Sequence, residues 1–173
     1  MKILYISTFA EPNPINSNQT SVSVVRNLLK RGYEVTMLTC TYDPTWRGEW
    51  PNFKNHISNV PVLHTVRDGI PYLVIDVPEK WCERAPHESI NEEAIKWGME
   101  IIKYLKPDVV HLQQWQNLSW LLESAQKLKV PTAYSVNDYG LTCMRTFLIK
   151  GDGSRCDGIQ GVNKCSECTL SGR

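Results

Sequence analysis

Short apolar runs alternate with amphipathic segments along this sequence, and this alternation leaves few folds open. The runs at 2–8, 34–39 and 108–112 show no regular polar alternation, which is typical of strands buried on both faces. Between such runs, apolar residues recur every three or four positions, as on one face of a helix. Strand–helix–strand units require parallel pairing with a right-handed crossover. The sequence therefore predicts a Rossmann-like α/β fold, a doubly wound, mostly parallel sheet flanked by helices.

Local signals indicate where the two main helices begin and end. Ser17 and Asn18 are both good N-cap residues for the first helix, and Gly32 supplies its stop. Ser89, with Glu92 three residues later, resembles a capping box for a helix that continues to residue 105.

The middle of the chain predicts a hairpin after an irregular stretch. Residues 40–60 are rich in Trp, Pro and Asn, and we expect a loop there. Two strands, 61–67 and 71–77, flank the turn signal Asp68-Gly69. A further helix over 118–129 should lead to a last buried strand over 130–136.

Length and charge limit the classes of function. A chain of 173 residues is a one-domain length, so we expect one lobe over 1–173 that includes a cysteine-rich loop over 143–168. A net charge of +1 without a clustered basic face gives no reason to expect nucleic acid as a partner. Neither a signal peptide nor a run of about 18 apolar residues is visible, so the expected location is the cytoplasm.

Polar side chains follow two of the predicted strands. His111, Gln113 and Trp115 stand at the end of one strand, and Asn137, Asp138 and Tyr139 follow the next. In open α/β sheets, ligands bind outside the carboxyl ends of the strands. Amides beside an aromatic face are typical of binding sites for a sugar or a nucleobase, and an amide with a carboxylate suits hydroxyl groups. The alternatives are a packing histidine and an Asx turn.

The loop that leads into the first helix is another candidate site. Free N–H groups at a helix N-terminus bind anions, which makes Asn16, Ser17 and Asn18 candidate ligand contacts. No glycine precedes Gly32, so the G-x-G-x-x-G dinucleotide fingerprint is absent. A plain connecting loop is the alternative.

Four of the six cysteines lie near the C-terminal end, at Cys143, Cys156, Cys165 and Cys168. Cys165-x-x-Cys168 has metal-ligand spacing, and the other two thiols could complete a tetrahedral structural zinc site. Free thiols and disulfides are the alternatives. An Asp152-Gly153 turn could form a small hairpin that ends near Cys156.

Several stretches in this order resemble the N-terminal, acceptor-side domain of family-4 retaining glycosyltransferases, which have the GT-B fold. They are MKILYIST, LLKRGYEVTMLT, PDVVHLQQWQN and VPTAYSVNDYGLTCMR, with the three later cysteines behind them. The resemblance implies transfer of a sugar, with retention, from a nucleotide-sugar donor to a glycan or lipid-linked acceptor. It also implies that a C-terminal lobe or a partner subunit binds the donor, that catalysis needs no metal, and that this chain is inactive alone.

The resemblance implies roles for particular positions. Asn16 to Asn18 stand where the family often has a Gly-Gly pair near the donor phosphates, and Asn137 stands where it often has a His near the donor sugar. Asn137 and Asp138 are therefore the expected catalytic positions. Because the glycines and the His are replaced, a non-catalytic binding or assembly module is the alternative. Lipid-linked acceptors would also imply peripheral contact with the inner face of a membrane.

Overall fold

The computed structural model describes residues 1–8, 16–40, 53, 55–78, 91–113, 118–137, 143, 147–158 and 161–170, with only the backbone at 16–18, 162, 169 and 170. The chain divides into two compact units, residues 1–135 and 136–173. The first unit contains the sheet, and the second contains the four clustered cysteines.

Within the described residues, the first unit holds one seven-stranded sheet in the order β3-β4-β5-β2-β1-β6-β7. Strands β5, β2, β1, β6 and β7 run parallel, whereas β3 and β4 pair antiparallel at one edge. The strands are β1 (Lys2–Ile6), β2 (Glu34–Cys40), β3 (Asn55–Ile57), β4 (Val60–Arg67), β5 (Ile70–Ile75), β6 (Val109–Leu112) and β7 (Thr132–Tyr134). The predicted doubly wound, mostly parallel sheet is confirmed.

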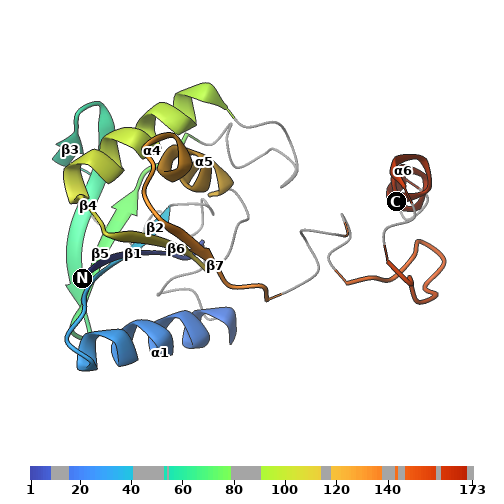
Figure 1. Ribbon diagram of the computed structural model, residues 1–173, viewed down its shortest axis with the longest axis horizontal. Helices are drawn as coiled ribbons and strands as arrows, with labels where there is room; N and C mark the ends of the chain where they lie inside the picture. The colour runs from blue at the N-terminus through green and yellow to red at the C-terminus, as the bar shows by residue number, and fades with distance from the viewer. Residues whose placement is uncertain are drawn as a thin grey trace. The chain divides into compact units, whose positions relative to one another are not determined.

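Helices cover both faces of this sheet. Helix α1 (Asn16–Lys30) lies on one face, and α4 (Glu92–Leu105) and α5 (Ser119–Lys127) lie on the other (Figure 1). Each face has its own apolar core, because alternate strand residues point to opposite sides. Ile3, Tyr5 and Met37 pack on the α1 side, whereas Leu4 and Ile6 pack on the α4 side.

The hairpin around Asp68-Gly69 is confirmed, but the loop expected over 40–60 contains a short strand. Residues Asn55–Ile57 form β3 and pair with β4. The prediction missed it because two of its three side chains are exposed and it shows no apolar pattern. Next to it, the Ser58 hydroxyl donates to a Glu100 carboxylate oxygen at 2.8 Å, which ties this edge to α4.

Two predicted boundaries need correction. The N-cap of α4 is Asn91, whose side chain accepts from the Glu93 N–H, so the capping box predicted from Ser89 and Glu92 is wrong. Asn is as good an N-cap as Ser, and Asn91 is the residue that directly precedes the first residue of α4. Strand β7 was expected to be buried, but it is the sheet edge, and Thr132 and Ala133 are exposed.

The second unit contains a small hairpin and helix α6 (Val162–Leu170). The predicted turn at Asp152-Gly153 is present, with Ile149 bridged to Arg155 and Gly153 at a φ of +83°. Helix α6, which carries both Cys165 and Cys168, was not predicted; a loop was expected over 143–168. None of the helices in the described ranges combines the length and apolar character needed to cross a membrane.

The contact between α4 and α5 depends on a missing side chain. A Cβ on Gly98 would lie 2.3 Å from the Ser124 Oγ and 3.1 Å from the Trp120 ring. That hydroxyl lies 2.9 Å from the Ile95 carbonyl and 2.6 Å from the Trp120 carbonyl, and it can donate its one proton to either of them. The two helices can therefore approach this closely only with glycine at position 98.

We expect Gly98→Ala to destabilise the first unit by about 1–3 kcal/mol, because overpacking outweighs the gain in helix propensity. Urea unfolding followed by tryptophan fluorescence measures this. Lys96→Ala, an exposed change on the same helix, serves as the control. If Gly98→Ala is as stable as the control or more so, the close helix contact does not constrain this position.

Candidate functional site

The parallel register brings the residues that follow β1, β6 and β7 to one edge of the sheet. The Gln113 N–H donates to the Ile6 carbonyl at 2.8 Å, and the Ser135 N–H donates to the Leu112 carbonyl at 3.0 Å. These bonds extend the sheet ladder by one residue beyond the strands. Gln113 and Ser135 are therefore held in place by backbone bonds at the carboxyl edge, where open α/β sheets bind ligands.

A buried tyrosine orients the Gln113 carboxamide. The Tyr5 hydroxyl donates to Gln113 Oε1 at 2.7 Å, and both side chains are buried. Burial raises the pKa of Tyr5 to about 12, and a hydrogen bond with Ser21 acts in the opposite direction. Tyr5 is therefore protonated at neutral pH and remains a donor, which fixes the oxygen of the carboxamide toward β1.

Serine residues join this edge to the start of α1. The Ser7 and Ser21 hydroxyl oxygens lie 3.0 Å apart, and both residues are fully buried. Because Ser21 also contacts Tyr5, the hydroxyls and the Gln113 carboxamide form one continuous polar network between β1, β6 and α1. A satisfied buried network of this kind holds its members in one arrangement.

A histidine–serine pair extends the polar edge toward β7. His111 Nε2 and Ser135 Oγ share a hydrogen bond of 2.8 Å. The His111 ring also packs edge-on against Tyr5, with ring centroids 4.8 Å apart. Burial lowers the pKa of His111 below its usual 6.5, so the imidazole is neutral at pH 7. A neutral imidazole donates a hydrogen bond from one ring nitrogen and accepts one at the other.

The structure brings together only some of the predicted site residues. His111 and Gln113 lie at the carboxyl edge as expected. Asn16, Ser17 and Asn18 form the first turn of α1. Asn137 is exposed and belongs to the second unit. Three predicted residues lie outside the described part of the chain: Trp115, Asp138 and Tyr139.

Sequence reasoning missed Tyr5, Ser7, Ser21 and Ser135. A signal for Tyr5 was present, because a tyrosine inside an otherwise apolar run must find a partner for its hydroxyl. The serines carried no such signal, since each stands next to a strand end or inside a helix pattern.

The four clustered cysteines are reduced and half-buried. Among the described residues, no three His, Cys, Asp or Glu side chains lie close enough to hold a metal ion. In this arrangement the structure does not assemble the zinc site that the spacing predicts, and the site stays a prediction.

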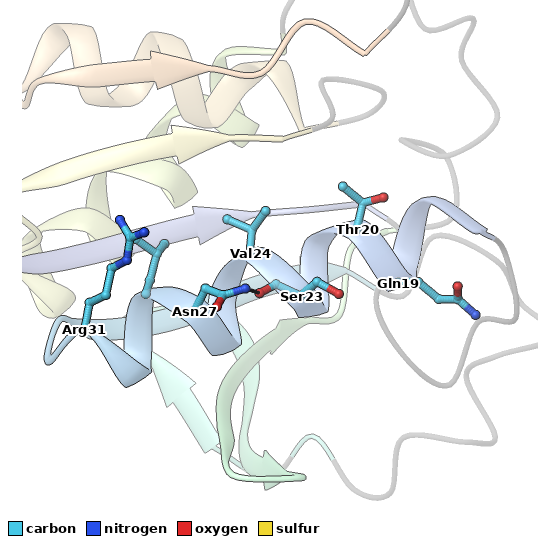
Figure 2. Close-up of a pocket in the computed structure, with 7 residues that line it drawn as sticks. Gln19, Thr20, Ser23, Val24, Asn27 and Arg31 are labelled. Atoms are coloured by element: carbon cyan, nitrogen blue, oxygen red, sulfur yellow. Dashed lines mark hydrogen bonds between the residues drawn. The ribbon is translucent and has the colours of Figure 1, made fainter.

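A hollow of about 690 Å³ lies elsewhere, along one flank of α1 (Figure 2). Arg26, on the opposite flank, reaches Asp68 in the β4–β5 turn at 3.4 Å, so the hollow is on the β6 side of the helix. It is lined by Gln19, Thr20, Ser23, Val24, Asn27, Leu28 and Arg31. No predicted site residue lines it, and we place the candidate site at the carboxyl edge instead.

Comparison with known proteins identifies the class of protein that this sheet and its polar edge belong to. Residues 18–155, more than half of the chain, match Glycosyltransferase Family 4. The chain therefore belongs to this family. No curated protein matches it.

Solved structures similar to the chain include two bacterial proteins. One is an Escherichia coli structure described as trehalose-6-phosphate bound with UDP-2-fluoro glucose (TM-score 0.48, 9% identity, 78% of this chain and 32% of that chain). Another is MurG of Acinetobacter baumannii (TM-score 0.43, 13% identity, 77% of this chain and 34% of that chain). This chain thus spans about a third of the length of either protein.

Removing the Tyr5 hydroxyl should leave the buried Gln113 oxygen without its donor. We expect Tyr5→Phe to lower the free energy of unfolding by about 1–3 kcal/mol. Tyr5→Phe combined with Gln113→Leu should recover part of this loss, because the buried carboxamide that lost the Tyr5 donor is then removed as well. Tyr104→Phe, at an exposed ring, is the matched control in urea unfolding. If Tyr5→Phe and Tyr104→Phe lowered the free energy of unfolding equally, the result would contradict the hydrogen-bond network.

The depressed pKa of His111 predicts a pH effect with a definite sign. The unfolded chain binds this proton more readily than the folded one, so folding stability should fall as pH drops below about 6.5. An NMR titration of the His111 ring should give a midpoint below 6.5. His111→Gln should weaken the pH dependence of stability, and a midpoint at or above 6.5 would contradict the burial of the ring.

Proposed function

We propose that this chain is the acceptor-binding lobe of a retaining glycosyltransferase. Membership of Glycosyltransferase Family 4 gives the reaction class. The observation that carries the assignment is the fixed polar edge formed by Tyr5, Gln113, His111 and Ser135. These groups stand at the carboxyl ends of adjacent parallel strands, beside the N-terminal half of α1.

In the proposed reaction, the bond between the anomeric carbon of the donor sugar and the nucleotide diphosphate oxygen breaks. A new bond forms from that carbon to an acceptor hydroxyl oxygen on the same face of the sugar, and the hydroxyl proton is released. The nucleotide-sugar donor would be held mainly by a C-terminal lobe or a partner subunit. The acceptor would be a glycan or a lipid-linked sugar, in the latter case at the surface of a membrane.

The lobe's own task in this reaction is to position the acceptor. A neutral His111 and the Ser135 hydroxyl can exchange hydrogen bonds with sugar hydroxyls without placing a buried charge beside them. The Tyr5–Gln113 bond holds the edge rigid underneath. Following the family resemblance, Asn137 and Asp138 would act in catalysis, and Tyr139 would contact the substrate. The first turn of α1, at 16–18, would face the donor phosphates.

Binding of an acceptor should perturb the carboxyl edge and leave the opposite edge unchanged. The ¹H–¹⁵N spectrum of the chain is to be titrated with a panel of methyl glycosides and short polyprenyl-diphosphate sugars. We expect at least one of these probes to shift the Ser7, Gln113 and Ser135 amides. The Gly69 and Asp108 amides, at the other end of the sheet, should not move.

Two histidine variants show whether the probe binds at the carboxyl edge of the sheet. His111→Ala should weaken binding of that probe about three- to tenfold, the value of one lost hydrogen bond. His64→Ala changes an exposed histidine on β4 and should leave binding unchanged. Shifts confined to the Gly69 edge, equal effects of the two variants, or no response to any probe would each count against the acceptor role.

A further inference from the structure

The described part of the second unit shows no apolar core of its own. None of its described residues falls in the buried class, and none belongs to either apolar core. Residues 136–173 are also fewer than the roughly 40 residues below which a domain needs disulfides, a metal or a partner chain. Hydrophobic burial among the described residues therefore does not account for a compact unit here.

The described residues of this unit include eight that are half-buried, and four of them are cysteines; the others are Leu148, Lys150, Gly151 and Gly158. Cys143, Cys156, Cys165 and Cys168 are all half-buried, whereas the large apolar residues Phe147 and Ile149 are exposed, at 71% and 47%. Thiols thus make up half of the half-buried positions described in this unit.

Two structural elements carry three of these thiols. Cys165 and Cys168 are three residues apart in α6, which puts both on one face of the helix, about 5–6 Å apart at Cβ. Cys156 ends the hairpin, where its N–H donates to the Leu148 carbonyl at 2.7 Å and its Sγ contacts the Gly158 carbonyl at 3.1 Å. The Asp152 side chain accepts from the Ser154 N–H at 2.8 Å and fixes the turn of that hairpin.

We propose that a structural zinc ion bound by Cys143, Cys156, Cys165 and Cys168 forms the core of the second unit. Four thiols lose their protons to become the ligands, and one Zn²⁺ binds them in tetrahedral geometry. Because the described side chains do not yet converge, binding must draw α6 and the hairpin together. The site has no open position, so it has no part in chemistry and does not depend on the proposed sugar transfer.

The test measures metal content and thiol state of the intact 173-residue chain. The chain is purified under reducing conditions from zinc-supplemented medium, and its zinc is quantified by mass spectrometry. We expect one zinc per chain, with the four thiols protected from a thiol reagent until a chelator is added. Cobalt substitution should then give the thiolate charge-transfer bands of a tetrahedral site.

Single substitutions assign the ligands. Cys156→Ser and Cys165→Ser should each abolish stoichiometric zinc, whereas Cys40→Ala, in the core of the first unit, and Cys82→Ala should retain it. Unchanged amide signals of β1, β2 and β6 in each variant show that the first unit is still folded. Chelation should broaden or shift signals only within 136–173.

Three results would each overturn the proposal. One is a chain without zinc in which the thiols have formed disulfides, seen as a loss of two hydrogens per bridge in the intact mass. Another is a chain without zinc in which all four thiols react at once with the reagent. Zinc that survives both Cys156→Ser and Cys165→Ser would assign the metal to other residues and would contradict it equally.

Discussion

The parallel pairing of β1 with β6, and of β6 with β7, is the constraint on which the candidate site depends. Its register places Ile6 beside Leu112 and Leu112 beside Tyr134, so all three strands end together. The residues that follow them must then share one edge, whatever their distance in sequence. Tyr5 and Gln113 are more than a hundred positions apart, yet their side chains are joined by a 2.7 Å hydrogen bond.

Much of the fold followed from the sequence because periodic patterns are local. The apolar runs gave β1, β2 and β6, and the Asp68-Gly69 signal gave the β4–β5 hairpin. Errors arose where tertiary context decides. Strand β3 exists because β4 offers it a partner, and β7 is exposed because it is the outermost strand of the described sheet, which its own composition does not reveal.

The candidate site was harder to predict than the fold. His111 and Gln113 could be expected, since polar residues after buried strands mark a ligand-binding edge. Their partners could not, because a hydrogen bond from Tyr5 or Ser135 requires the register between strands. The family resemblance gives Asn137 a catalytic role. Because Asn137 belongs to the second unit, the strand register of the sheet does not fix its position.

The two units of the chain differ in how their described residues are buried. The first is stabilised by two apolar cores on either side of a sheet, and it uses a buried hydrogen-bond network to fix its functional edge. The second has no residue of the buried class among those described, and four half-buried cysteines lie within it. Membership of Glycosyltransferase Family 4 covers most of the first unit and extends into the second, up to residue 155.

The central claim is that the edge formed by Tyr5, Gln113, His111 and Ser135 binds a sugar acceptor. Intermolecular nuclear Overhauser effects between a bound glycoside and the chain test it most directly. The account predicts effects from sugar protons to the His111 ring and the Ser135 side chain. Effects instead to Thr20, Val24 and Leu28 would place the sugar in the hollow beside α1 and would contradict the account.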